Sequence, residues 1–469
     1  MSPSSPDVSP ELKSNFCGRN SSSSILSTAV SECAGCVGSV LGQLNTYDIY
    51  PFMETTAIHE RNRSLVQILP SRSEVSQFYH FYRNPVHLLM PMIVDINSFE
   101  SELCRYLGAY AADELQNPDS LPAHWRSNES IGFFGLLLAA LSVGIHYSNL
   151  DLPHRARLCL EFARRSMQAL RLANFLFRPS LNAVQTLVII GNVLQNNGQS
   201  DAAWSLLGTT IRLAQSMGLH VESKVPQQRQ AINPIASSVW NILVWQDVSI
   251  SACYDRPPIV TSKWLGREAV PPQTDLSYPE VLISIARIWL ELGGIDTVDA
   301  EIQAGRLLRT LQAVDDSSSV PSSSVSFLIR PALRQSFEIE DVAVYNHLLN
   351  RAKTSLIQTP KAFLDLQAIS VVPMRSWTMI HMVLWSTLVL SLWKNTRDDP
   401  ECHDLQKKII RAFSSSNLFG NHDVPFATGE NKWTSKEHIR AFTALLTAIS
   451  NKHHNRRNGV VIANQSERQ

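Results

Sequence analysis

Cys33 and Cys36 form a C-x-x-C pair, the spacing at which two thiolates can bind one zinc ion. A structural zinc site needs four ligands, yet only Cys17 precedes this pair and no second pair follows at a suitable distance. The surrounding sequence SECAGCVG has no Lys or Arg, which a DNA-binding finger needs for phosphate contacts. We interpret the three cysteines as ordinary residues of a tail, with metal binding as the alternative.

Two acidic pairs, Asp315-Asp316 and Asp398-Asp399, have the residue type that binds magnesium. A helical terpene cyclase would place such carboxylates on one face of a helix. The first pair lies in a serine-rich segment, the second precedes Pro400, and neither has a third carboxylate at helical spacing. Solvated loop residues are therefore the favoured interpretation.

Three isolated histidines, His146, His220 and His381, lie beside apolar runs. Such histidines are more often buried or helix-end residues than catalytic bases. The sequence has no G-x-S-x-G, no Gly-rich phosphate loop and no H-E-x-x-H. We therefore assign no catalytic residues, no cofactor-binding residues and no metal ligands, and we expect that the protein is not an enzyme.

The charge balance also limits the class of partner. With 41 Lys and Arg against 41 Asp and Glu, the chain has no basic surplus for binding nucleic acid on its own. A local patch could still contact DNA. The compact basic cluster His453, His454, Arg456 and Arg457 is a poor nuclear localisation signal and is interpreted as part of a solvated tail.

The cysteine content and the N-terminus indicate an intracellular, reduced protein. Seven cysteines are odd in number and sparse, so no disulfide framework follows. The start MSPSSPDVSP lacks the basic and apolar segments of a secretory signal. Two stretches, Ser130 to Leu150 and Ser376 to Trp393, reach about the 20 residues of a membrane span. Because both contain polar residues that are costly in lipid, buried core helices are predicted and no membrane.

Helical spacing of apolar residues recurs along most of the chain, whereas alternating patterns bounded by hairpin turns are nearly absent. The predicted fold class is all-α, a single large multi-helix bundle with a disordered N-terminal tail. The tail spans residues 1–45, and the helical domain spans 46–452. A disordered loop is predicted at 315–326, and a flexible C-terminal tail at 453–469.

The clearest unit is a helical hairpin from Pro179 to Gly218. Asn196-Asn197-Gly198 supplies its turn, because these residues tolerate positive φ, and Ser200 or Asp201 can cap the second helix. Further helices are predicted at Glu129–Tyr147, His154–Ala173, Ala236–Tyr254, Tyr278–Ala313, Val342–Thr359, Met374–Asn395, Glu401–Ser415 and Ser435–Ser450.

The spacing of Trp204, Leu207, Gly208 and Ile211 imitates the start of a tetratricopeptide repeat. No second copy lies about 34 residues away, and a solenoid needs at least about three repeats. The motif is instead interpreted as close packing, in which Gly lets a neighbouring helix approach. The tryptophans expected in the core are Trp204, Trp240, Trp245 and Trp377.

The hairpin sequence SLNAVQTLVIIGNVLQNNGQSDAAWSLLGTTIRLAQSMGLHVES resembles the signature of the fungal-specific transcription factor domain. This domain is the regulatory region, called the middle homology region, of fungal zinc binuclear cluster regulators. Its signature runs from a Leu- and Gln-rich helix through a polar turn to an A-W-x-L-x-G helix that ends A-Q-x-x-G-L-H. Three further segments are similar to parts of the family pattern: Phe81–Leu103, Gly132–Ser148 and Ser237–Val260.

The sequence departs from the family pattern in three places. Members usually carry six cysteines in a basic segment before this domain, whereas the leading residues here hold three cysteines and almost no basic residues. The DNA-reading zinc cluster is therefore absent from the expected position. Asp255 replaces the Gly before Arg256 and Pro257, and the sequence QQRQ at 227–230 replaces a more basic run.

Asp247 lies on the inward face of a predicted helix, shortly before Arg256. A buried carboxylate requires a partner, and Arg256, directed by Pro257-Pro258, is the predicted one. We interpret the pair as architectural, with ligand binding as the alternative.

The resemblance implies a transcription regulator in the nucleus of a fungus. It implies the transcriptional machinery or a zinc-cluster protein as partner, and control of a metabolic pathway or a secondary-metabolite gene cluster. Contact with DNA is expected to be indirect. A small-molecule effector could occupy apolar interhelical space, and a dimer is compatible with the family. The alternative function is an all-α enzyme or accessory protein of secondary metabolism on the same fold.

Overall fold

The computed structural model describes residues 57–221, 234–254, 256–262, 278–291, 342–415 and 444. Every regular element in these residues is helical and none is a strand, which confirms the all-α prediction. The α-helices are α3 (Ile58–Ile68), α4 (Arg72–Phe81), α5 (His87–Leu89), α6 (Ile96–Ala111), α7 (Asn128–Tyr147), α8 (Leu152–Leu172), α9 (Leu181–Asn196), α10 (Ser200–Ser216), α12 (Pro234–Tyr254), α13 (Tyr278–Glu291), α16 (Val342–Ile369), α17 (Trp377–Leu392) and α18 (Pro400–Ser415). A π-helical turn (Tyr82–Val86) and a 3-10 turn (Ala123–Arg126) complete the described elements.

Several predictions from the sequence fall outside the described residues. These are the tail at 1–45 with its three cysteines, the loop at 315–326, the tail at 453–469 and the last part of the predicted helix Tyr278–Ala313. The predicted helix Ser435–Ser450 also lies outside them, except for Ala444.

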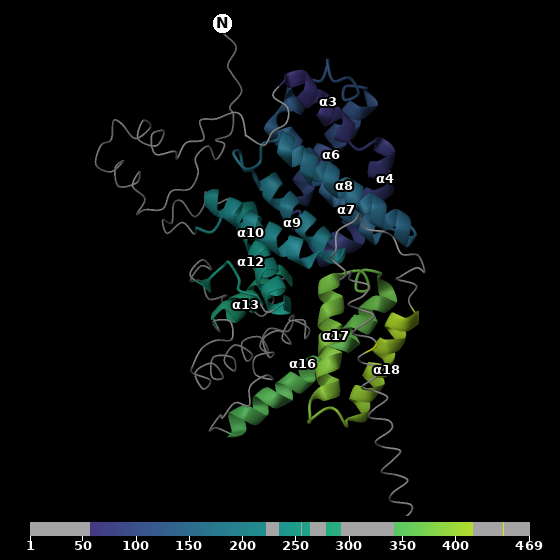
Figure 1. Cartoon of the computed structure of the whole chain (residues 1–469), viewed down its shortest axis with the longest axis vertical. Helices are drawn as coiled ribbons and strands as arrows, with labels where there is room; N and C mark the ends of the chain where they lie inside the picture. The colour runs from purple at the N-terminus through teal and green to yellow at the C-terminus, as the bar shows by residue number, and fades with distance from the viewer. Residues whose placement is uncertain are drawn as a thin grey trace, which may run out of the picture.

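Helix α7 is the centre of the main core. It starts where the Ser127 side chain accepts a hydrogen bond from the Ser130 N–H, and every residue from Ser130 to Ile145 is buried. The helix is long and apolar enough to cross a membrane, but 94% of its most apolar window is buried inside the protein. This burial agrees with the core helix predicted at Glu129–Tyr147. Figure 1 shows α7 among α3, α4, α6, α8 and α9, which together form the upper body of the molecule.

A close approach between α4 and α7 depends on Gly144. A Cβ atom at this position would lie 2.3 Å from the backbone oxygen of Phe78 on α4, far inside van der Waals contact. Only the absence of a side chain lets the two backbones meet here. The edge-to-face contact of Phe78 with Phe162 of α8, with ring centroids 6.2 Å apart, then joins α4 to a third helix.

The predicted hairpin is present as α9 and α10. Ser180 caps α9 through the N–H of Ala183, and Gly198 and Gly218 both adopt positive φ at the two helix ends. The predicted cap of α10 is wrong. Gln199 is the N-cap residue, and its side chain makes no cap bond. Ser200 instead contacts Tyr254 at the end of α12, and Asp201 contacts Arg256 just after it.

The last three described helices pack together below this body in Figure 1. Two small apolar clusters join them, one around Phe363, Val383 and Ile409, the other around Leu356 and Leu390. The sequence predicted that α16 ends at Thr359, and this end is wrong. Pro360 costs the helix one backbone hydrogen bond, but continuing to Ile369 buries Phe363 in the first cluster.

Candidate functional site

Asp247 projects from the middle of α12 into the protein and is 1% exposed. Its Oδ2 accepts hydrogen bonds from the N–H groups of Ile259 and Val260, both at 2.8 Å. The carboxylate therefore holds the segment that follows α12 against the helix. Burial raises the pKa of Asp247 to about 6, although the two N–H donors oppose that shift by favouring the charged form.

The predicted pair of Asp247 with Arg256 is wrong. The Arg256 guanidinium turns the other way and forms an ion pair with Asp201 in the first turn of α10. It also lies over the rings of Trp204 and Tyr254, with centroids at 5.2 and 5.4 Å. Backbone N–H groups take the place of the arginine because Asp247 is fully enclosed, whereas Arg256 can keep part of its charge in water. The architectural role predicted for Asp247 agrees with this geometry.

Gly208 allows this segment to lie close to α10. A Cβ atom at Gly208 would lie 3.0 Å from Cδ1 of Ile259. The sequence predicted that a neighbouring helix approaches this glycine, but the contact comes from the segment after α12. Trp204 beside it is only half-buried, as is Trp245, whereas Trp240 and Trp377 are buried as predicted.

Tyr254 connects α12 to two other helices. Its hydroxyl lies 2.5 Å from the Ser200 Oγ at the start of α10, and its ring lies 6.1 Å from that of His381 on α17. Burial raises the pKa of Tyr254 to about 12, so the phenol stays protonated and can donate or accept a hydrogen bond.

The segment after α12 is thus held by Asp247 on one side and by the pair of Arg256 with Asp201 on the other. We define the Asp247 clamp as Asp247, Ile259, Val260, Arg256 and Asp201.

A second set of contacts joins the end of α7 to the segment before α17. The His146 Nε2 lies 2.9 Å from the backbone oxygen of Arg375. In return, the Arg375 Nη1 donates to the backbone oxygens of His146 at 3.3 Å and Ser148 at 2.7 Å. Burial lowers the pKa of His146 to about 4, so the ring is neutral. We call this set the Arg375 latch.

The other two histidines are also enclosed by aromatic side chains. His220 has its ring 5.9 Å from that of Trp240, and burial lowers its pKa. His381 lies beside both Tyr254 and Trp377. The structure therefore places all three histidines as buried or helix-end residues, as the sequence predicted.

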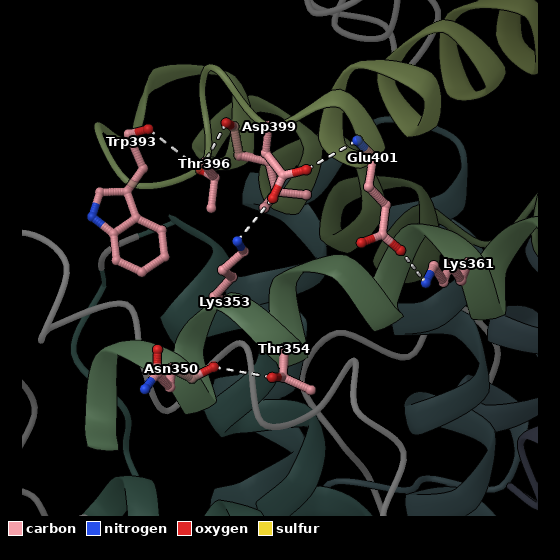
Figure 2. A network of polar contacts seen from close by, with 9 residues as sticks. Asn350, Lys353, Thr354, Lys361, Trp393, Thr396, Asp399 and Glu401 are labelled. Carbon is pink, nitrogen blue, oxygen red and sulfur yellow. Dashed lines mark hydrogen bonds and ion pairs between the residues drawn. The ribbon is translucent and has the colours of Figure 1, made fainter. Parts of the chain in front are cut away.

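The two carboxylates of the acidic pair just before α18 have different roles, and Figure 2 shows the contacts of Asp399. Asp398 is exposed and contacts Arg397, which fits the predicted solvated loop. Asp399 does not fit that prediction. Its Oδ2 accepts from the Lys353 Nζ at 2.8 Å and its Oδ1 from the Glu401 N–H at 3.0 Å, and the Lys353 bond lowers its pKa. Lys361 and Glu401 form a second ion pair between α16 and α18, at 2.6 Å.

No group of three metal-ligating side chains occurs within the part of the chain that the structure describes. The four cysteines in this part form no disulfide with one another: Cys104, Cys159, Cys253 and Cys402. The described clusters hold segments of the chain together, because each enclosed carboxylate or guanidinium named above binds backbone groups or an opposite charge.

Sequence reasoning missed Ser200, Asp201 and Arg375 as partners. The two contacts to α10 join residues 54 and 55 positions apart, and the latch joins residues 229 apart. No local pattern carries that information, because these contacts depend on how the helices pack.

Comparison with known proteins finds a family whose model matches the region that contains the Asp247 clamp. Residues 78–280 match the model of the fungal specific transcription factor domain. Over 90 residues the chain is 36% identical to an uncharacterized transcriptional regulatory protein of Schizosaccharomyces pombe, a match that spans 19% of this chain and 14% of that relative. No solved structure matches. From residue 78 to residue 280 the chain is therefore similar to a fungal specific transcription factor domain.

Proposed function

We propose that this protein regulates transcription in the nucleus and acts through protein partners rather than by reading DNA itself. The match of residues 78–280 to the fungal specific transcription factor domain carries this proposal. The similarity to a transcriptional regulatory protein supports it. A net formal charge of zero supports indirect contact with DNA, through a partner that owns a zinc cluster.

The finer part of the proposal concerns the genes under control. We infer a metabolic pathway or a secondary-metabolite gene cluster as the target, because regulators with this domain often control such genes. A small-molecule effector and a dimeric state belong to the same proposal.

Transcript measurement in the source organism tests the proposal. Deletion of the gene should change the transcripts of a group of neighbouring biosynthetic genes, and the wild-type gene should restore them. A Lys361→Ala copy is the matched control and should restore them equally, because its surface ion pair contributes little to stability. Unchanged transcripts across the genome would refute a regulatory role.

A binding experiment tests the indirect contact with DNA. The purified chain should be retained weakly on promoter DNA, and retention should disappear as the salt concentration rises. Addition of a zinc-cluster partner should restore retention at physiological salt. Tight, sequence-specific retention of the chain alone would overturn this part of the proposal, and steady turnover of a pathway metabolite would favour the enzyme.

A further inference from the structure

The helices α16, α17 and α18 contact one another, and two apolar clusters lie between them, each with residues from all three helices. The Phe363 cluster includes Phe363, Val383 and Ile409. The Leu356 cluster includes Leu356, Leu390 and Cys402. Because both clusters span the same three helices, the residues between them on each helix form one layer across the unit.

Ser386 lies between the two clusters on α17. It follows Val383 by three residues and precedes Leu390 by four, so it shares their face of the helix. It is 0% exposed. Thr387 and Ser391 on the same helix donate to carbonyl oxygens four residues back, whereas the buried Ser386 Oγ has no partner within the described part of the chain. This hydroxyl therefore needs a partner from outside its own helix.

Gln406 occupies the matching position on α18. It follows Cys402 by four residues and precedes Ile409 by three, and it is 2% exposed. The buried Nε2 of its amide has no hydrogen-bond partner among the residues that the structure describes. Burial of an amide is costly unless the amide is hydrogen-bonded. Two facing helices thus bring unpartnered polar groups to the same layer.

The third helix, α16, supplies acceptor oxygens. Thr359 follows Leu356 by three residues and precedes Phe363 by four, and it is buried. Its hydroxyl donates to the Ser355 oxygen at 2.9 Å, so the Thr359 oxygen can still accept a bond. Pro360 beside it has no N–H for the Leu356 carbonyl oxygen, which an α-helix would otherwise pair with that residue. The layer therefore combines donors from α17 and α18 with acceptors from α16.

We propose that one ordered water molecule binds in this layer and bridges Ser386 to Gln406. We call Thr359, Ser386 and Gln406 the polar layer. A water molecule can accept a bond from the Gln406 Nε2, share a bond with the Ser386 hydroxyl and donate to an oxygen of α16. Buried waters typically make about three hydrogen bonds to groups that the protein leaves unpaired. The site would thus join three helices at the centre of their packing.

The surroundings of the polar layer favour water over other occupants. The layer is one residue deep on each helix, and an apolar cluster adjoins it on either side, so the occupant must be small. A metal ion is a poor occupant, because the unpartnered Nε2 is a donor and the polar layer has no carboxylate. Enclosed sites lined by polar groups hold water, whereas enclosed apolar cavities stay dry.

A crystal structure of the purified full chain, at a resolution that shows ordered waters, tests the proposal directly. We expect electron density for one water within about 2.7–3.2 Å of both the Ser386 Oγ and the Gln406 Nε2. A direct hydrogen bond between these two side chains, or a layer without such density, would overturn the proposal.

The stability of Ser386→Ala provides a second test, in which the direction of the change decides. Its control is Ser205→Ala, at an exposed position of α10, which gives the same gain in helix propensity. If the hydroxyl binds a water, the unfolding equilibrium constant of Ser386→Ala should exceed that of the control about fivefold. If the hydroxyl is dry and unpartnered, its removal relieves a desolvation cost, so Ser386→Ala should be at least as stable as the control. Urea unfolding measures both constants, and the second result would overturn the proposal.

A double-mutant cycle tests whether one water joins the two side chains. Gln406→Met keeps the length of the side chain but removes the amide, so in this background Ser386→Ala should change the unfolding equilibrium constant less than about twofold. In the control background Gln358→Met, at an exposed position of α16, Ser386→Ala should keep its full effect. Equal effects in both backgrounds would refute the bridge. These measurements are independent of transcript levels, so their failure would leave the regulatory role open.

Discussion

The matched domain and the helices α16 to α18 hold distant segments together in different ways. In the matched domain the segment after α12 is held by an enclosed side chain that binds backbone groups, since Asp247 accepts from Ile259 and Val260. The pair of Arg256 with Asp201 beside it is more exposed. Between α16 and α18 the connecting side chains bind each other at the surface, as in the pair of Lys361 and Glu401, which are 39% and 51% exposed. Loss of a buried partner leaves backbone groups without hydrogen bonds, whereas loss of a surface partner leaves a group that water can solvate. The two regions should therefore respond very differently to single substitutions.

The largest effect is expected at the contact between α4 and α7. Gly144→Ala would place a Cβ 2.3 Å from a backbone oxygen that has no room to retreat, and should lower the unfolding free energy by about 3 kcal/mol or more. Urea unfolding followed by tryptophan fluorescence measures this. The matched control is Gly108→Ala on α6, where a Cβ meets nothing within 4 Å, and this variant should be as stable as the wild type or slightly more stable.

The next effect is the pH dependence that comes from Asp247. Burial raises its pKa in the folded protein to about 6, above the 3.8 of an ordinary Asp. Folding therefore favours the protonated form, so the contribution of Asp247 to stability is fully present below pH 3.8 and is lost as pH rises through about 6.

Asp247→Asn removes this titration and gives the measurement its reference. The unfolding free energy of the wild type minus that of the variant should fall by up to about 3 kcal/mol between about pH 4 and pH 8. Urea unfolding at a series of pH values provides both curves. A difference that does not change over this range would contradict the burial of an ionisable carboxyl.

Arg375→Ala should have a smaller effect, about 2 kcal/mol, because it leaves two carbonyl oxygens without their donor. Hydrogen exchange should accelerate in peptides that cover the end of α7 and the start of α17. Arg397→Ala removes an arginine from an exposed pair with Asp398 and serves as the control. Equal exchange in both variants would show that the latch does not restrain these segments.

The smallest effects are expected for the two ion pairs in Figure 2. Double-mutant cycles should give coupling energies below about 1 kcal/mol for both pairs, falling as salt rises. Lys353 with Asp399 should exceed Lys361 with Glu401, because Asp399 is only 23% exposed. A larger coupling energy for Lys361 with Glu401 than for Lys353 with Asp399 would contradict the expectation that the less exposed ion pair is the stronger one.

The sequence predicted the helices whose apolar spacing is regular, including α7, α8, α9 and α12. It missed α3, which buries Asn62 beside its apolar residues through a hydrogen bond to the Pro118 oxygen. It also missed α4, although Ser71 and Glu74 form a capping box that the S-x-x-E spacing could have revealed. Both helices are short, and each buries only two apolar side chains, Leu65 and Ile68 in α3 and Val75 and Phe78 in α4. So few positions give periodicity too little to detect.

For the candidate site, the sequence correctly predicted that the Asp247 carboxylate is buried, but its predicted partner, Arg256, is wrong. Burial of Asp247 follows from its place on an apolar helix face, which is local information. The direction of Arg256 depends on where Asp201 and Trp204 lie, and these belong to a helix whose packing no local pattern specifies. Contacts of this kind require the assembled fold.

The Arg375 latch has a consequence for the synthesis of the protein. The ribosome makes α7 long before it makes residue 375, 229 positions after His146. Until then, the carbonyl oxygens of His146 and Ser148 lack their Arg375 donor. A translation product that stops before residue 375 would keep these two oxygens open to water.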